Sequence, residues 1–288
     1  MRLEDLEVPF LPSRSHGITV DEGIALTKPF GRHQILTIII ANLIWFPTNI
    51  ILTALPYMQQ RPSFECQDTA SSADWIPCEE SQFCASSSLA FRVTADSPKS
   101  MIIDFELYCD RSIYIALIAS AFFIGCLAGL FFFSPLSDKY GRKYALRRLL
   151  PFEPVLALAF CLSFSPEMMV VVQFLAGCVL CPASMTAFVW AVEFMGVKHG
   201  NIVATVLNVV YAVVSMMSPL TMLVTDDWRQ MAYLYVVAGI CAFVSMFWIE
   251  ESPRTLVTVL KNYDEARKVF RKIARRNGVE QEFNYRFY

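Results

Sequence analysis

A short charged segment, SPLSDKYGRK, lies between two long apolar runs and carries side chains that can form ion pairs. Asp138 and Arg142 are four residues apart, so on a helical turn the carboxylate and the guanidinium face each other. Gly141 supplies the backbone freedom that a tight chain reversal needs. Lys139 and Lys143 add two positive charges. The pattern predicts a charged hinge held by ion pairs; the alternative is a basic turn that only orients the chain in a membrane.

Polar side chains inside the apolar runs form a second set of candidates, because an unpaired polar group in hydrocarbon is costly. We expect some of them to contact a substrate; hydrogen bonding between helices is the alternative for each one. Aromatic side chains in the same runs could form apolar walls and attract an organic cation through their ring faces. The polar candidates are Asn42, Asn49, Gln173, Tyr211 and Ser215, and the aromatic ones are Trp45, Phe46, Phe188 and Trp190.

Residue patterns typical of catalysis do not stand out in this chain. We find no nucleophile with a base, no phosphate-binding loop and no cluster with metal-ligand spacing. We therefore expect no enzymatic activity, no cofactor and no bound metal. The basic residues lie beside apolar runs and do not build a soluble basic face, so a nucleic-acid partner is not expected either.

Four of the nine cysteines lie in one polar stretch, residues 56–112. An even set of cysteines in a segment outside the cell predicts two disulfides, with three possible pairings that the sequence does not rank. A zinc site is the alternative, although the spacings lack paired C-x-x-C motifs. The other five lie in apolar runs, where we interpret cysteine as a small apolar residue. The disulfide candidates are Cys66, Cys78, Cys84 and Cys109.

The apolar runs that carry these residues indicate an all-α membrane protein. Hydrophobic residues make up 55% of the chain, above the roughly 45 to 50% of soluble domains. Five runs reach the ~20 residues that cross a bilayer core of roughly 30 Å. A sixth is short and carries Glu153 between Pro151 and Pro154. The expected spans are about 34–55, 113–136, 149–164, 168–195, 201–224 and 230–249.

The positions of Lys and Arg predict the orientation of these spans, since positive segments stay in the cytoplasm. With six spans, most of the 24 Lys and Arg residues fall on the side of the amino terminus. We therefore expect residues 1–33 and 250–288 to be cytoplasmic, 34–249 to form a six-helix bundle, and 56–112 to be extracellular. Residues 250–288 also show helical apolar spacing, which predicts an amphipathic linker helix; an ordinary capped surface helix is the alternative.

The hinge resembles the signature loop between helices two and three of the major facilitator superfamily, through Asp138, Lys139, Gly141, Arg142 and Lys143. Further segments resemble the organic cation and anion transporters of the solute carriers. They are DEGIALTKPFGRHQ before the first span, FELYCD before the second, and ESPR and KIARRNG after the sixth. The resemblance implies the six-helix amino-terminal bundle of a major facilitator superfamily transporter, with a large cysteine-containing extracellular loop after its first helix.

The resemblance also implies an ion-pair network at the inner end of the bundle, in which Glu193, Glu251 and Arg254 join Asp138 and Arg142. The chain departs from the family pattern at four positions. Ser134 stands where the family has Gly, Gln173 and Gly200 where it has Arg, and Thr255 where it has Trp.

The function that the resemblance implies is transport of small organic ions across the plasma membrane by alternating access. This chain would be the amino-terminal half of such a transporter. Its partners would be the organic ion, the lipid bilayer, and a carboxy-terminal six-helix half or a full-length relative. The alternative is a truncated membrane protein that transports nothing and pairs with full-length transporters.

Overall fold

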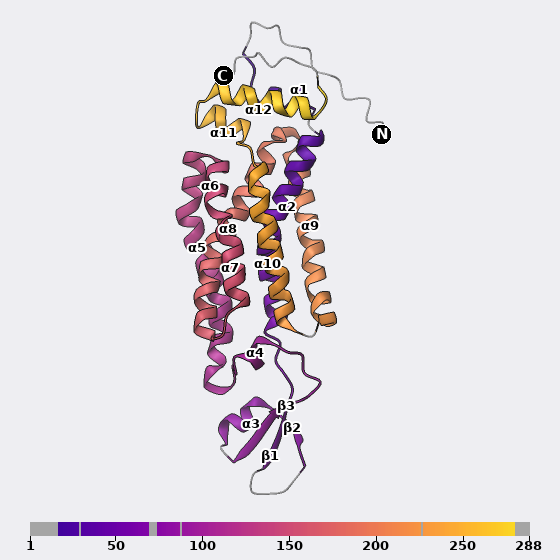
Figure 1. Cartoon of the computed structure of the whole chain (residues 1–288), viewed down its shortest axis with the longest axis vertical. Helices are drawn as coiled ribbons and strands as arrows, with labels where there is room; N and C mark the ends of the chain where they lie inside the picture. Colours follow the sequence, from indigo (N-terminus) through magenta and orange to yellow (C-terminus); the bar gives the residue numbers. More distant parts are fainter. Residues whose placement is uncertain (1–16, 29, 69–73, 87, 226, 280–288) are drawn as a thin grey trace.

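Five long helices stand side by side and form the body of the protein (Figure 1). The computed structural model describes residues 17–279, apart from 29, 69–73, 87 and 226. Within this part of the chain, five helices are long and apolar enough to cross a membrane. They confirm the expected all-α membrane fold. The helices are α2 (Arg32–Met58), α5 (Ile113–Tyr140), α8 (Pro166–Glu193), α9 (Gly196–Thr225) and α10 (Trp228–Ser245).

The segment of the predicted third span is built from two short helices in succession, α6 (Arg142–Leu149) and α7 (Phe152–Cys161). They have 8 and 10 residues, so neither is long enough to cross a bilayer alone. Pro151 lies between them and has no backbone N–H, which interrupts the helix at that point. Figure 1 shows α6 and α7 at successive levels along the bundle. The helical segment thus begins at Arg142, directly after the hinge, earlier than residue 149.

Helices α5 and α8 approach so closely that their backbones nearly touch. A Cβ atom on Gly125 would lie 2.0 Å from the carbonyl oxygen of Phe174, so only glycine permits this contact. Cys126 and Cys181 form a disulfide across the same helix pair, with their Cα atoms 5.3 Å apart. Our interpretation of these two cysteines as small apolar residues is therefore wrong, because the close packing brings their sulfur atoms together.

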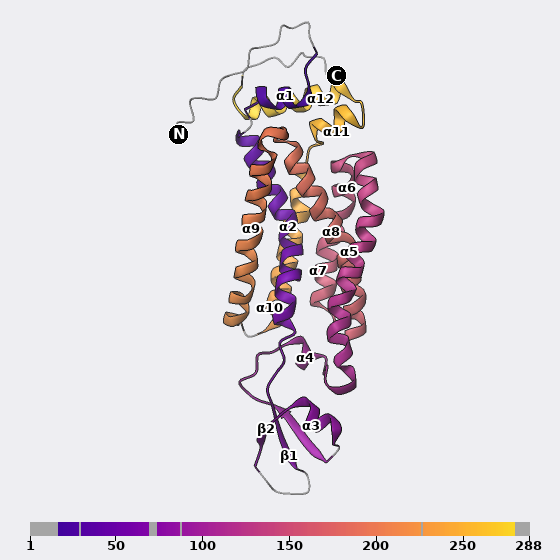
Figure 2. The same cartoon turned by 180° about the vertical axis from the view of Figure 1, so that it is seen from behind.

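A small disulfide-linked cap extends from one end of the bundle, which we call the cap end (Figures 1 and 2). Its sheet has the antiparallel order β2-β1-β3, with β1 (Phe64–Asp68), β2 (Ile76–Cys78) and β3 (Leu89–Val93). Helix α3 (Glu80–Ala85), helix α4 (Met101–Asp104) and the 3-10 turn η1 (Cys109–Ser112) complete it. Of the three possible pairings, the structure has Cys66–Cys78 and Cys84–Cys109.

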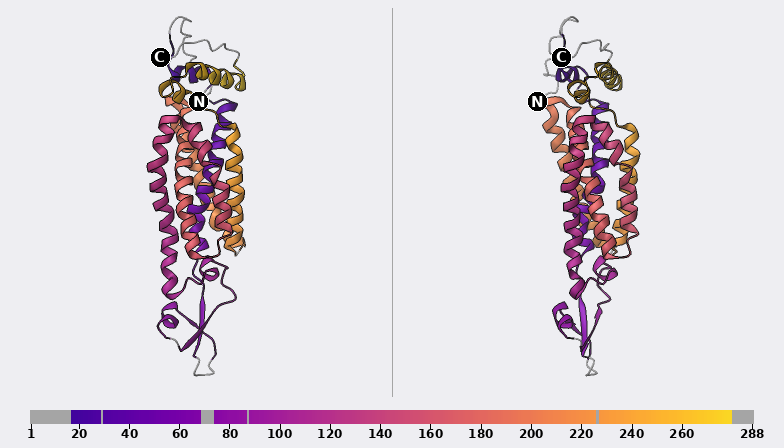
Figure 3. Two further views of the ribbon diagram at one scale, coloured as in Figure 1. Left: turned by 60° about the vertical axis from the view of Figure 1, so that its left-hand side comes forward. Right: turned by 90° about the vertical axis from the view of Figure 1, so that its left-hand side faces the viewer.

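Three helices lie across the opposite end of the bundle, which we call the α12 end (Figures 1 and 3). They are α1 (Val20–Leu26), α11 (Pro253–Thr258) and α12 (Tyr263–Arg276), and the 3-10 turn η2 (Met246–Trp248) leads into them. Ser252 caps the start of α11, because its hydroxyl accepts a hydrogen bond from the backbone N–H of Thr255. Helix α12 is amphipathic: it buries Val269, Phe270 and Ile273. This apolar face holds the carboxy-terminal segment against the bundle.

Candidate functional site

Two hinge side chains, Asp138 and Ser137, meet the guanidinium of Arg142 at the α12 end. One of its amino groups pairs with Asp138 and with the hydroxyl of Ser137, and the other lies 3.2 Å from Glu193 on α8. Asp138 is 69% exposed, so its pair is screened by water and contributes about 0 to 1 kcal/mol. Arg142 and Glu193 are only 17% and 12% exposed. The Arg142–Glu193 pair is therefore the stronger connection, and it joins α6 to α8.

The family pattern implies that Glu251 forms an ion pair, but in the structure it binds backbone N–H groups. Its carboxylate accepts hydrogen bonds from the backbone N–H groups of Arg142 at 2.9 Å and of Lys143 at 3.2 Å. These N–H groups begin α6, where a helix has no partners of its own. Burial raises the pKa of the Glu251 carboxyl, against the lowering effect of its backbone hydrogen bonds. The contact ties the segment before α11 to the hinge.

Gly141 makes room for this contact. Its backbone has φ of +100°, a conformation that L side chains rarely adopt, and a Cβ atom there would lie 2.4 Å from a carboxylate oxygen of Glu251. The hinge therefore needs glycine at this position for two reasons, the backbone angle and the space.

Two partners in this network were missed by reasoning from the sequence. Arg254 pairs with Asp21 on α1, at 2.6 Å, instead of joining Arg142. The hydroxyl of Thr255 donates to the second oxygen of Glu193 at 3.2 Å. Thr255 was visible only as a departure from the family pattern, and Asp21 only as the first residue of the DEGIALTKPFGRHQ segment, with no role assigned. The charge cluster thus extends over α1, α6, α8 and α11.

A second contact holds α12 to the start of α2. The side-chain amide of Asn277 donates to the carbonyl oxygen of Thr27 at 2.6 Å and to the side-chain oxygen of Gln34 at 2.8 Å. Its oxygen accepts the backbone N–H of His33 at 2.9 Å. Glu250 nearby pairs with Lys272 and Arg276 of α12. Sequence reasoning placed Asn277 only inside the KIARRNG motif and gave it no role.

A pocket of about 470 Å³ lies between α2 and α9 and collects several of the polar and aromatic candidates. Asn42, Trp45, Phe46 and Tyr211 line it. The Trp45 ring stacks on Phe188 and meets Tyr211 edge-on, each with ring centroids 5.7 Å apart. A hydrogen bond from the Trp45 indole to the carbonyl oxygen of Ser184 fixes the ring. The arrangement offers aromatic faces and an amide to an organic ion.

Asn49 lines the same pocket and, with Ser215, also forms hydrogen bonds between helices. The amide of Asn49 donates to the carbonyl oxygen of Tyr211 at 2.9 Å, and the hydroxyl of Ser215 donates to Asn49 at 3.0 Å. These bonds connect α2 to α9. For Ser215 the structure therefore shows hydrogen bonding between helices, the alternative to substrate contact. Gln173 is fully buried and does not line the α2–α9 pocket. Trp190 is also buried, and its indole donates to the carbonyl oxygen of Glu250, so it forms no wall of this pocket.

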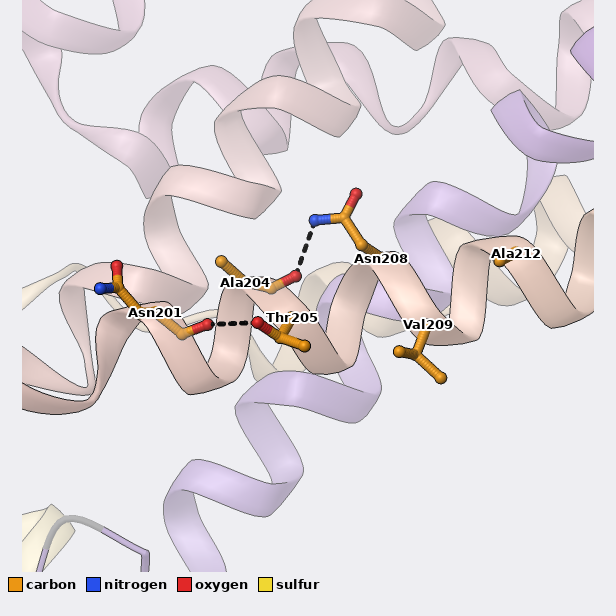
Figure 4. A pocket seen from close by; sticks show the side chains of 6 residues that line it. All are labelled: Asn201, Ala204, Thr205, Asn208, Val209 and Ala212. Atoms are coloured by element: carbon orange, nitrogen blue, oxygen red, sulfur yellow. Dashed lines mark hydrogen bonds between the residues drawn. The ribbon is translucent and has the colours of Figure 1, made fainter.

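A second pocket, of about 500 Å³, follows the exposed side of α9 (Figure 4). Asn201, Thr205 and Asn208 line it and are exposed. The hydroxyl of Thr205 and the amide of Asn208 donate to backbone carbonyl oxygens one turn earlier in the same helix. In the most apolar 18-residue stretch of α9, only 12% is buried inside the structure, whereas the corresponding stretch of α2 is 50% buried. Helix α9 thus presents a free face that carries polar side chains.

Comparison with known proteins shows the family to which these features belong. The model of a family described as sugar (and other) transporter matches residues 34–286. The chain belongs to the sugar (and other) transporter family. This family model covers the bundle, the α2–α9 pocket and all of the charge cluster except Asp21, and it confirms the expected relation to the major facilitator superfamily.

Similar proteins include organic cation/carnitine transporters and members of solute carrier family 22. Human organic cation/carnitine transporter 2 is 30% identical over 182 residues, 62% of this chain and 32% of that protein. Organic cation/carnitine transporter 4 of Arabidopsis thaliana is 26% identical over 255 residues, 86% of this chain and 46% of that protein. Mouse solute carrier family 22 member 2 is 27% identical over 185 residues, 64% and 33% of the two chains. The chain spans less than half the length of each of these curated relatives.

Proposed function

We propose that this chain is the amino-terminal half of a transporter that moves small organic ions across the plasma membrane by alternating access. The observation that carries the proposal is the α2–α9 pocket, in which Asn42, Trp45 and Tyr211 meet beside the free face of α9. A polar helix face within a membrane needs a partner. A second six-helix bundle on this face would close the pocket into a binding site between two halves.

The lining of the pocket supports an organic ion as the substrate. Its aromatic rings, Trp45, Phe46 and Tyr211, give apolar contact and attract positive charge through their faces. The amide of Asn42 lies on the same lining and can fix the orientation of a polar group. The human and Arabidopsis relatives are named as organic cation/carnitine transporters, which agrees with an organic ion that carries a positive charge.

The charge cluster at the α12 end would bias the protein toward one access state. Arg142, Glu193 and Glu251 connect segments that belong to different helices, so movement of one helix against another would break their bonds. Each exposed pair is worth little, about 0 to 1 kcal/mol. The buried Glu251 contact to the hinge adds hydrogen bonds that cannot be replaced by water without opening the cluster.

Uptake by reconstituted vesicles tests the proposal. The chain alone should show no saturable uptake of organic cations, because half of the binding site is absent. Co-reconstitution with the carboxy-terminal half of a relative should restore it. Trp45→Ala should then reduce uptake, since it removes a wall of the pocket, while Trp248→Ala, at an exposed position, should not.

Two results of this experiment would contradict the proposal. Saturable uptake by the chain alone would indicate that two copies build the path. Suppression of a full-length relative, with no uptake in any combination, would instead favour a pairing protein that transports nothing.

The orientation is a separate part of the proposal and has its own test. We propose that the α12 end faces the cytoplasm, with both termini, and that the cap lies outside the cell. Tags inserted in the loop 56–112 should be labelled in intact cells, whereas tags at residues 1–33 or 250–288 should need permeabilised cells. Labelling of the tail in intact cells would show the opposite orientation.

A further inference from the structure

Among the described residues, the long-helix bundle contains fully buried polar side chains whose polar atoms have no hydrogen-bond partner. Three of them are Glu153 on α7, Gln173 on α8 and Tyr235 on α10, each 0% exposed. Within the described part of the chain, their side-chain carboxyl, amide and hydroxyl groups have no hydrogen-bond partner. An isolated carboxylate in such surroundings is so costly that the group takes up a proton instead. The transport mechanism proposed above uses none of these three residues.

Glu153 on α7 and Tyr235 on α10 lie in a region where these two helices pack closely. A Cβ atom on Gly239 would lie 3.2 Å from Pro154 and 3.3 Å from the carbonyl carbon of Glu153. Tyr235 is one helical turn before Gly239 and so shares its face of α10. The Tyr235 ring packs edge-on against Phe160, seven residues after Glu153 on α7, with ring centroids 5.7 Å apart. Tyr235 is also within electrostatic range of Glu153.

Charged side chains on α8 and α10 pair with groups other than the Glu153 carboxyl. On α10, Arg229 pairs with Asp104 and donates to a backbone carbonyl at the cap end. On α8, Glu193 pairs with Arg142 at the α12 end, and Glu167 is exposed at the first turn. The group that α8 adds in the buried interior is the uncharged Gln173. Among the described residues, none supplies a positive charge to the Glu153 carboxyl.

We propose that Glu153 is a proton-binding site between α7 and α10. In this conformation the carboxyl holds one proton on a carboxylate oxygen; as that O–H bond forms, an O–H bond of a hydronium ion breaks and leaves water. A shift of α10 against α7 lets water reach the site, and the proton returns to that water and leaves a carboxylate. The Tyr235 hydroxyl and the Gln173 amide are donors of the kind that can stabilise the charged form. Full burial excludes an occupant larger than a proton.

Proton binding would couple pH to the access states. This use of the site rests on the proposed function, because only a transporter with two access states can load the proton on one side and release it on the other. The binding itself does not depend on transport. The two statements therefore have separate tests.

Infrared spectroscopy of the whole chain in lipid nanodiscs tests proton binding directly. At neutral pH the wild type should show the C=O stretch of a protonated carboxylic acid. Glu153→Gln, which preserves shape, should lose this band, while Glu167→Gln on the first turn of α8 should retain it. Tyr235→Phe keeps the ring and removes a donor to the carboxylate, so the band should persist to higher pH. Absence of the band in the wild type, or its survival in Glu153→Gln, would overturn the proposal.

Uptake in the two-half reconstitution tests the coupling. A pH gradient across the vesicle should change uptake by the wild type, and Glu153→Gln should lose this response while uptake down a substrate gradient continues. An unchanged pH response in Glu153→Gln would overturn the coupling. If no combination transports, the proposed function fails, and the infrared result still decides whether Glu153 binds a proton.

Discussion

Replacing Gly141 by alanine should destabilise the protein more than any ordinary surface substitution. The backbone at Gly141 has φ of +100° and ψ of 160°, a region that is nearly restricted to glycine. Forcing alanine into it costs about 1 to 3 kcal/mol. The new methyl group would also collide with the Glu251 carboxylate and displace the cap of α6, which is worth about 0.5 to 2 kcal/mol. The expected loss in the free energy of unfolding is therefore about 1.5 to 5 kcal/mol, the sum of these two ranges.

Gly278 provides a matched control for the backbone effect. It also has a positive φ, +70°, but a Cβ atom there would meet nothing within 4 Å. Gly278→Ala should cost only the left-handed backbone penalty, about 1 to 2 kcal/mol. A second control is Gly141→Ala in a Glu251→Ala background. In that background the new methyl group has no carboxylate to collide with. The cost of Gly141→Ala in unfolding free energy should therefore be about 0.5 to 2 kcal/mol smaller than in the wild type.

Reversible unfolding of the purified chain in detergent, followed by circular dichroism, would measure these differences. Equal losses for Gly141→Ala and Gly278→Ala would refute the argument from crowding. So would an equal cost of Gly141→Ala with and without the Glu251 carboxylate.

Four further predictions concern the α12 end and the cap. Glu251→Gln keeps an oxygen that accepts the N–H groups of α6. Because burial raises the pKa of Glu251 in the folded state, the wild type should lose stability as pH rises through that pKa, and the Gln variant should not; unfolding measured from acidic to neutral pH checks this. Arg142→Lys replaces a forked contact to Glu193 and Ser137 by a point charge, so uptake by the assembled transporter should fall more than its surface delivery, as measured by biotinylation. Asn277→Ala removes the contacts of α12 with α2 and should cost about 1 to 3 kcal/mol in unfolding free energy and speed proteolysis of the tail. Peptide mapping without reduction should recover two cap disulfides, Cys66–Cys78 and Cys84–Cys109.

The charge cluster shows where prediction from the sequence succeeds and where it stops. The spacing of Asp138 and Arg142 predicts their contact, and the structure has it. The single helical turn assumed for it is absent, because Gly141 ends α5 and Arg142 begins α6. The partners of Glu251 and Arg254 could not be predicted in this way. Arg254 reaches Asp21, which is far away in the sequence, and Glu251 binds backbone N–H groups that carry no sequence signal.

Some of the polar candidates line the pocket and others do not, and the sequence could not separate them because their contacts are with distant segments. A polar residue in an apolar run can contact a substrate or another helix, and the sequence does not say which neighbour it faces. Asn42 and Tyr211 line the α2–α9 pocket, whereas Ser215 forms a hydrogen bond between these two helices. It buries Gln173, whose position in an apolar run is no different in kind from that of Asn42.

The sequence by itself determined the class of protein and the membrane helices, since a bilayer demands long apolar runs and every backbone hydrogen bond within a helix is local. The amphipathic α12 follows from local spacing as well. Only the tertiary structure decided how the cysteines pair, including Cys126 with Cys181, and that Glu153 is fully buried with no hydrogen-bond partner among the described residues. These features depend on which faces of distant helices pack together, and that is fixed by the fit of side chains across the whole bundle.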